Sequence, residues 1–376
     1  MADDTLDRDG RITPEALAAF DARKGLKLRV NNVFNDRADA RSIRRFCDGI
    51  GEGNPLFTDG DYARASSRGV LTAPPSFVMS VFPGWILQGL PGVHAFHSSF
   101  DFRFERDIVE DMAIVPESTF TGYHFVQTKF NGEALIEHQT ARYLTSEGEL
   151  IAEAKVSGLR VERQAIRAAD YYKDIQLPHP WSAGELDDLN ERILAQRPRG
   201  AKPRCHEDVA IGDKLPELIK GPLGITDVIA YCVGAMPVHL LAHELALRHS
   251  AAHPAWEVRD RDSRAVEPIF GVHYNQGAAE SVGMPYPYDI GSQRFCWQVQ
   301  ALTDWMGDDG RLLRCKVKFR DFVFLSDAVF LNGTVSKKYV DAQGRSCVRV
   351  DTRAFNQRGA VVMDGFADVQ LPTREG

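Results

Sequence analysis

The chain repeats one order of predicted elements, and this repeat constrains the fold more than any other feature. Apolar residues at helical spacing predict a helix over Asp39–Ile50 and, after the midpoint, a capped helix beginning near Gly224 and an apolar helix over Arg294–Trp305. Each half then continues into segments rich in Phe, Val, Thr and Tyr, which is typical of strands. These segments are Ser98–Glu105, Ser118–Phe130, Leu135–Thr145 and Leu150–Val161, then Leu312–Phe324, Ala328–Tyr339, Arg345–Asn356 and Val361–Leu371. The pattern predicts a diverged internal duplication of an α+β unit.

A polar, proline-bearing segment separates the two halves. We place an N-terminal domain at 1–165, a linker at 166–205 and a C-terminal domain at 206–376. Two domains also suit a length of 376 residues, which exceeds the usual size of one compact domain. Within the linker we expect a helix over Ala183–Gln196. Asn131–Gly132 and Asn332–Gly333 are both predicted to form turns.

Charge and cysteine usage exclude several classes of protein. The net charge is −7 and no strong basic block is present, so we expect no nucleic-acid partner. The six cysteines are scattered without a Cys-x-x-Cys pair, which favours reduced thiols in a cytoplasmic protein. The N-terminus lacks the apolar region of a signal peptide, and no apolar run approaches the length of a membrane span.

The stretch from Phe270 to Gly291 combines a titratable ring with small residues. It contains His273, then Ala279 and Gly283, and it closes on Gly291. This pattern predicts a short, tightly packed helix that places the imidazole beside a later backbone N–H. Such a pair is a candidate catalytic site.

Several blocks of the chain resemble one family. IRRFCDGIGEGNPLFTDGDYA resembles the motif of the MaoC-like (FAS1-like) two-domain acyl dehydratases, which include (R)-specific enoyl-CoA hydratases, and VHYNQGAAESVGMPYPYDIG resembles the same motif from its histidine onward. GPLGITDVIAYCVG, YDIGSQRFCW and LTDWMGDDG are similar to the second half of two-domain members. The resemblance implies an α+β double hot-dog fold, with a long helix wrapped by an antiparallel sheet in each domain.

The resemblance also implies a reaction: hydration of a trans-2-enoyl-CoA, or dehydration of a 3-hydroxyacyl-CoA. The family's machinery is an Asp/His pair that activates one water, together with a backbone N–H that receives the thioester oxygen. This chemistry requires a base, an acid and an enolate donor, and it requires no cofactor or metal.

In the first half, the family's aspartate falls on Glu52 and its histidine falls on Phe57. A phenyl ring cannot transfer protons, so the resemblance implies a non-catalytic first domain. We interpret Glu52 as a solvated turn residue.

In the second half, the resemblance places the catalytic histidine on His273 and the oxyanion glycine on Gly291, whereas the family's aspartate falls on Pro268. The carboxylate that pairs with His273 is therefore left open. Asp289 is the favoured replacement, and Glu267 and Glu52 are the alternatives.

Three neighbouring residues complete the predicted site. Asn275 replaces an aspartate of the motif, Tyr288 lies beside Asp289, and Arg294 could pair either with Asp289 or with a substrate phosphate. We assign Asn275, Tyr288 and Arg294 to substrate binding. Extra residues before His273 predict an insertion over the site.

A second cluster contains four histidines within that insertion. These are His239, His243, His249 and His253. Histidines four residues apart on a helix can bind a metal, but the spacing is also typical of the polar side of an amphipathic helix. We favour the amphipathic helix and expect no metal.

Three functions remain open. The first is a CoA-thioester hydratase or dehydratase. The second is a non-catalytic double hot-dog subunit that binds acyl-CoA or completes a partner's site, and the third is an acyl-CoA thioesterase. An acyl-CoA thioester is the expected partner in each case, whereas the acyl group and the choice between a homodimer and a partner hot-dog subunit are not specified by the sequence.

Overall fold

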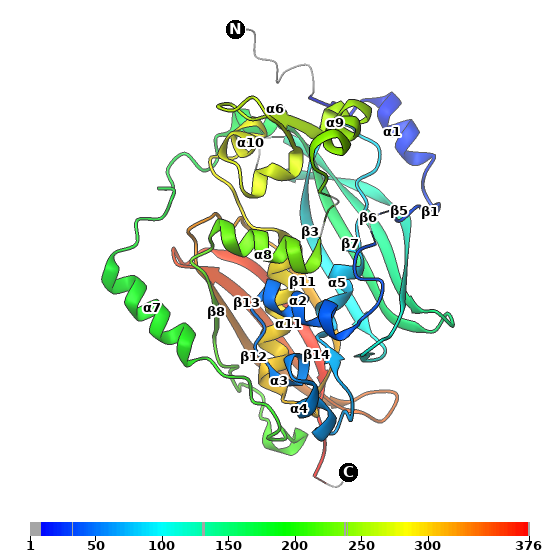
Figure 1. Cartoon of the computed structure of the whole chain (residues 1–376), viewed down its shortest axis with the longest axis vertical. Helices are drawn as coiled ribbons and strands as arrows, with labels where there is room; N and C mark the ends of the chain where they lie inside the picture. Colours follow the sequence, from blue (N-terminus) through cyan, green and yellow to red (C-terminus); the bar gives the residue numbers. More distant parts are fainter. Residues whose placement is uncertain (1–8, 32, 130–131, 237, 239, 375–376) are drawn as a thin grey trace.

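A computed structural model describes residues 9–31, 33–129, 132–236, 238 and 240–374. Its main feature is a ten-stranded antiparallel sheet with the strand order β1-β5-β6-β7-β3-β11-β14-β13-β12-β8 (Figure 1). The strands are β1 (Lys27–Leu28), β3 (Val93–Phe104), β5 (Ile114–Thr128), β6 (Gly132–Thr145), β7 (Leu150–Glu162), β8 (Leu218–Lys220), β11 (Arg311–Phe319), β12 (Val329–Val340), β13 (Ser346–Asn356) and β14 (Val361–Gln370). Two small sheets pair β2 (Thr72–Ala73) with β4 (Ile108–Val109), and β9 (Glu257–Arg259) with β10 (Val266–Pro268).

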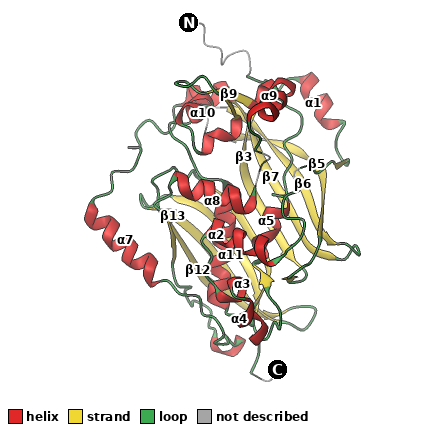
Figure 2. Ribbon diagram, viewed as in Figure 1, coloured by secondary structure: helices red, strands yellow, loops and turns green. Residues whose placement is uncertain are grey.

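Helices α2, α5, α8 and α11 gather on one face of the sheet (Figure 2). The α-helices are α1 (Pro14–Asp21), α2 (Ala40–Ile50), α3 (Pro55–Thr58), α4 (Gly60–Ala65), α5 (Val78–Val81), α6 (Arg163–Ala169), α7 (Ala183–Ala195), α8 (Ile225–Ala235), α9 (His243–Ala252), α10 (Gln276–Ser281) and α11 (Gly291–Met306). The 3₁₀-helices are η2 (Pro75–Phe77), η3 (His206–Asp208), η4 (Pro254–Trp256) and η5 (Ile269–His273). Among the described residues, no helix combines the length and apolar character needed to cross a bilayer.

The two halves share one sheet because their first long strands pair with each other. β3 of the first half and β11 of the second are antiparallel neighbours, with Phe102 opposite Cys315. α11 is buried along almost its whole length against this surface. In the first half, the helical segment directly before β3 consists of η2 and α5, and it is much shorter than α11. The arrangement confirms the predicted α+β double hot-dog fold.

The internal duplication is visible where α2 crosses α8. Both helices have eleven residues, and a glycine occupies the tenth position of each, Gly49 and Gly234. A Cβ at Gly49 would lie 2.7 Å from the carbonyl oxygen of Ala230, and one at Gly234 would lie 2.3 Å from that of Arg45. The helices therefore approach so closely that a side chain is excluded from equivalent positions on both. This equivalence supports the duplication predicted from the sequence.

The linker contains the predicted helix as α7. Leu189 on α7 packs with Ile219 and Ala328, which attaches the linker to the edge of the sheet at β8. A capping box at Ser182 and Glu185 begins the helix. The predicted boundary at residue 165 falls within α6, which continues directly from β7.

Two local expectations were wrong. Asn332–Gly333 lies inside β12 rather than in a turn. A Cβ at Gly333 would lie 2.9 Å from the side chains of Leu215 and Val350. The glycine thus permits close packing rather than a reversal. The first long strand begins at Val93 rather than Ser98. The other predicted turn, Asn131–Gly132, lies partly outside the described residues.

Candidate active site

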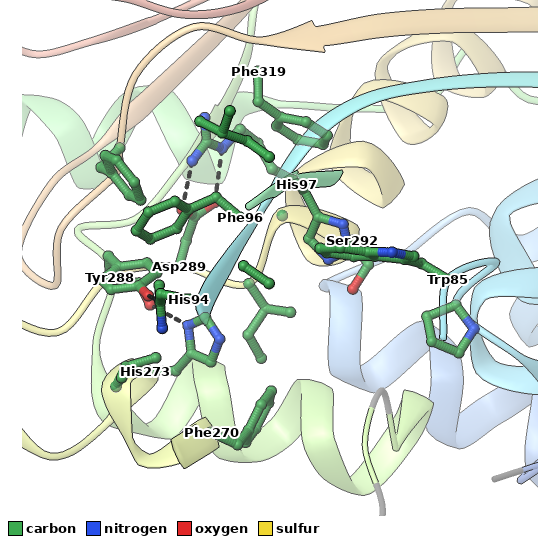
Figure 3. A pocket seen from close by; sticks show the side chains of 18 of the residues that line it. Trp85, His94, Phe96, His97, Phe270, His273, Tyr288, Asp289, Ser292 and Phe319 are labelled. Carbon is green, nitrogen blue, oxygen red and sulfur yellow. Dashed lines mark hydrogen bonds and ion pairs between the residues drawn. The ribbon is translucent and has the colours of Figure 1, made fainter. Parts of the chain in front are cut away.

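A cavity of about 270 Å³ lies where β3 of the first half meets the beginning of α11 of the second (Figure 3). Its walls are largely aromatic, which suits an apolar ligand. The aromatic lining comprises Trp85, Phe96, Trp256, Phe270, Phe319 and Phe322. Its polar lining includes three histidines and the first residues of α11, so titratable groups and free backbone N–H groups face one volume.

His273 ends η5 and presents its ring to the cavity. Its Nδ1 lies 2.8 Å from the carbonyl oxygen of Tyr288. Because a carbonyl only accepts hydrogen bonds, Nδ1 carries the proton and Nε2 carries a lone pair. Burial lowers the pKa of His273, which keeps the ring neutral near pH 7. The arrangement provides a general base at Nε2.

The short helices around His273 fix this position. Pro268 directly precedes η5, and Asn275 begins α10 by accepting a hydrogen bond from the backbone N–H of Ala278 at 2.9 Å. The Asn275 amide also donates to Asp260 at 2.7 Å. The Asn275 side chain is therefore engaged in capping, and it is not among the residues that line the cavity. Its contacts orient the loop that carries His273.

Gly291 is the first residue of α11 and lies beside His97. The backbone N–H groups of Gly291 and Ser292 have no acceptor within the helix, because the first turn of any α-helix leaves its donors free. Both residues line the cavity. The helix dipole adds partial positive charge at this end. The beginning of α11 can therefore receive a developing oxyanion.

His94 and His97 face the same cavity from β3, and sequence reasoning missed both. His94 Nε2 lies 3.1 Å from the hydroxyl of Tyr288, whereas the buried Nδ1 atoms of His94 and His97 have no hydrogen-bond partner among the described residues. Burial lowers the pKa of His94 well below its usual value, with a further contribution from Arg163. The first domain thus contributes two neutral imidazoles to a cavity that His273 lines from the second.

Tyr288 contacts both His273 of the second domain and His94 of the first. Its carbonyl binds His273, its hydroxyl binds His94, and its ring packs edge-on against His273 with centroids 5.0 Å apart. Burial raises the pKa of Tyr288, so the phenol remains protonated. Tyr288 lines the cavity, and its contacts position both histidines.

Asp289 and Arg294 form a buried ion pair rather than separate parts of the site. The guanidinium of Arg294 holds both carboxylate oxygens of Asp289, with Nε–Oδ2 2.7 Å and Nη2–Oδ1 2.5 Å. Arg294 Nη1 also donates to the carbonyls of Asp321 and Val362. The Asp289 carboxylate is thus bound by Arg294, and His273 is held by the adjacent carbonyl. This pair fixes the bend that leads into α11.

The other two carboxylate candidates lie away from the lining of the cavity. Glu267 is on β10, where the hydroxyl of Tyr274 lies 3.4 Å from its carboxylate. Glu52 is only 5% exposed, so its interpretation as a solvated turn residue was wrong. Burial and the charge of Asp304 raise the pKa of Glu52 to about 8, and burial lowers the pKa of nearby Lys220 to about 8. The chain reverses through a packed turn there, which buries the carboxylate.

The insertion before His273 partly encloses the cavity, as expected. Val238 and Trp256 come from this segment and contribute to the lining. Within it, α9 begins at His243 and has no buried residue. The rings of His249 and His253 are 4.7 Å apart, and His239 lies outside the described residues. Among residues with described positions, no group of three or more His, Cys, Asp or Glu side chains could hold a metal.

The fold and the cavity define a double hot-dog protein with a site between its two halves. Comparisons with known proteins supply the family. Residues 31–154 match the FAS1-like, dehydratase domain region. A UPF0336 protein of Parafrankia sp. (strain EAN1pec) is 31% identical over 122 residues, which cover 31% of this chain and 78% of that protein. The chain belongs to the FAS1-like dehydratase family.

Solved structures agree on the fold across almost the whole chain. A MaoC-like dehydratase aligns with a TM-score of 0.62 at 16% identity, covering 94% of this chain and 99% of its own. A MaoC domain protein from Chloroflexus aurantiacus J-10-fl gives 0.58 at 11%, covering 94% and 96%. Rv0216 of Mycobacterium tuberculosis, which has a double hot-dog fold, gives 0.55 at 10%, covering 94% and 97%. At these identities the likeness shows the fold alone.

Proposed function

We propose that the chain catalyses the reversible hydration of an enoyl-CoA thioester, with dehydration of the 3-hydroxyacyl-CoA as the reverse reaction. One observation carries the proposal. The lone pair on His273 Nε2 opens into a cavity that also receives the free N–H groups at the start of α11. A base and an oxyanion donor facing one apolar volume are the two requirements of addition to an unsaturated thioester.

The proposed reaction uses the groups in a definite order. His273 Nε2 removes a proton from water while the water oxygen bonds to C3 of the enoyl group. The C2–C3 double-bond electrons move toward the thioester, and the N–H groups of Gly291 and Ser292 receive the charge on its oxygen. The imidazolium of His273 then returns its proton to C2, which restores the base and completes the addition of water.

Other residues of the site hold these groups in place. The carbonyl of Tyr288 fixes the tautomer of His273, and the Asp289–Arg294 pair fixes the backbone between Tyr288 and Gly291. We propose Asp289 and Arg294 as positioning residues, because Arg294 binds both carboxylate oxygens of Asp289. The aromatic walls would receive an apolar acyl group.

The test is turnover of trans-2-enoyl-CoA substrates of several chain lengths, followed as loss of enoyl absorbance, with His273→Gln alongside. We expect the variant to lower kcat/KM by about 10²- to 10⁴-fold, which is the usual contribution of a general base. The wild-type kcat/KM should stay constant as the pH falls below 6.5. The reason is that the lowered pKa of His273 keeps its imidazole neutral at a pH where a free histidine would be protonated. His124→Gln, on β5, is the matched control.

Equal activity of His273→Gln and wild type would reject His273 as the base. Measuring free CoA in the same assays separates this reaction from thioester hydrolysis. CoA release without loss of the enoyl or hydroxyacyl group would favour a thioesterase instead.

One observation favours a second candidate, a non-catalytic subunit. Each carboxylate that lines the cavity is engaged, since Asp289 is bound by Arg294 and Asp321 is bound by Lys129 and Tyr172 at 2.8 and 2.5 Å. The family's free acid is therefore missing. Inactivity of the purified chain, with activity restored by a single hot-dog partner, would support this candidate.

A further inference from the structure

We propose that His97 is a second catalytic residue, whose neutral Nε2–H donates to the thioester oxygen beside the N–H of Gly291. The inference rests on the proposed hydratase function and deepens it. It gives the first domain, which lacks the family's histidine at Phe57, a direct part in the chemistry.

The position of the His97 ring carries the proposal. A Cβ built on Gly291 would lie 2.8 Å from His97 Cδ2, 3.0 Å from its Cβ and 3.1 Å from its Cγ. The imidazole therefore lies directly on the first residue of α11. Cδ2 is bonded to Nε2, so the nitrogen at this edge of the ring belongs to the neighbourhood of Gly291. Figure 3 shows His97 beside Ser292 and Trp85 in the same part of the cavity.

Hydrogen bonding assigns the proton to Nε2. His97 Nδ1 is buried and has no partner among the described residues. A buried N–H without an acceptor is rarer in proteins than an acceptor without a donor. Nδ1 is therefore assigned the lone pair, which leaves the proton on Nε2. A donor then faces the volume that the thioester oxygen would occupy.

Packing holds this ring in one orientation. It lies between Trp85 and Phe100, at centroid distances of 5.1 and 4.9 Å, and Phe319 follows at 6.0 Å. Burial, with smaller contributions from His273 and Arg294, lowers the pKa of His97 to about 3. The imidazole is thus neutral at physiological pH. A neutral imidazole held near a helix N-terminus can polarise a carbonyl without titrating.

The experiment compares His97→Leu and His97→Gln in the full chain, with enoyl-CoA hydration as the readout. His97→Leu removes the donor but keeps an apolar side chain, so we expect kcat to fall by about 10²- to 10³-fold with KM changed much less. The side-chain amide of His97→Gln can donate from a similar position. We therefore expect His97→Gln to recover at least 10-fold of the lost kcat, with an unchanged pH profile.

The outcomes separate the two proposals. Wild-type kcat in a folded His97→Leu variant, with His273→Gln inactive, would overturn the role of His97 and leave the hydratase intact. Equal losses in His97→Leu and His97→Gln would also overturn it, since a donor would then be irrelevant. Thermal melting of both variants shows whether each is folded. If His97→Leu does not fold, the kcat of His97→Gln decides whether His97 has the proposed role. Inactivity of the wild type would reject both proposals.

Discussion

Two corners of the molecule occupy equivalent places in the duplicated halves, and only one of them is open. The open corner joins β3 to the start of α11, and its cavity measures about 270 Å³. The equivalent corner joins β11 to the segment at Ala73 and Pro75, and its cavity measures only about 30 Å³. The sequence resemblance places the family's histidine on His273 in the first corner and on Phe57 in the second. The corner with phenylalanine at the motif position is therefore also the corner with little space for a ligand.

The closed corner is filled with buried hydrophobic side chains. Phe57 is 4% exposed and lines the small cavity together with Leu56, Met306 and Leu312. Leu312 lies on β11, which is the partner strand of β3 and so corresponds to the strand that carries His94 and His97. Burial of a phenyl ring contributes stability that a solvated imidazole would not. The comparison contrasts a corner filled by packed apolar side chains with a corner that keeps a cavity lined by titratable groups.

Each corner also draws on both halves of the chain. The open corner takes His273 and Gly291 from the second domain and His97 from the first, whereas the closed corner takes Phe57 from the first and Leu312 from the second. This reciprocity follows from pairing β3 with β11. Neither domain alone would contain a complete site.

Phe57→Ala tests the contrast between the open and closed corners, and we expect it to have the largest effect on stability. Truncation of a buried phenylalanine typically lowers the free energy of unfolding by about 3–5 kcal/mol. Because Phe57 does not line the open cavity, kcat in the folded protein should stay within about threefold of wild type. Urea unfolding and enoyl-CoA turnover measure the two quantities. Phe125→Ala, at a side chain 40% exposed, is the control, and a large loss of kcat in folded Phe57→Ala would mean that the corners are coupled.

The sequence was sufficient for the architecture, and it named several residues that line the open cavity. Periodicity and turn residues predicted the duplication, the linker helix and most strands, and the motif placed His273 and Gly291 at one cavity. These features are local in the chain. The motif also predicted the asymmetry between the halves, because it placed Phe57 where a histidine is required.

The lining residues that the sequence did not indicate depend on contacts between distant segments. His94 and His97 were missed because the strand was predicted to start at Ser98, and a register shift between His97 and Ser99 interrupts the alternation. Even a correct strand would not have revealed that β3 pairs with β11 of the other half. The burial of Glu52 likewise depends on packing between α2, β8 and α11, which no local pattern encodes.

Gly291→Ala tests the open corner, and we expect a smaller effect from it than from Phe57→Ala. The added Cβ would meet His97 at 2.8 Å, so the ring must move away from the start of α11. We expect kcat to fall by about 100-fold, the usual cost of one lost oxyanion donor. Gly184→Ala, in the first turn of α7, is the matched control because a Cβ there has no neighbour within 4 Å. Unchanged kcat in Gly291→Ala would show that the contact with His97 is not needed.

The smallest effect concerns the pH dependence of stability near the closed corner. The pKa of Glu52 is raised from 4.5 to about 8, chiefly by burial and then by Asp304. A group with a raised folded-state pKa contributes stability below its unfolded pKa and loses that contribution as the pH rises through the folded value. Between pH 6 and 8, Glu52 should therefore make the folded state less stable as pH increases.

Glu52→Gln removes this titration, because the amide stays neutral throughout. Asp304, whose pKa is raised to about 6 by burial, is already half ionised at pH 6 and titrates only in the lower part of this window. Lys220, whose pKa is lowered to about 8, loses its proton mainly above it. We expect the free energy of unfolding to decline less between pH 6 and 8 in Glu52→Gln than in wild type, as measured by urea denaturation at each pH. A wild-type slope in the variant would assign the pH dependence to another group, and Asp304→Asn would then be the next substitution to compare.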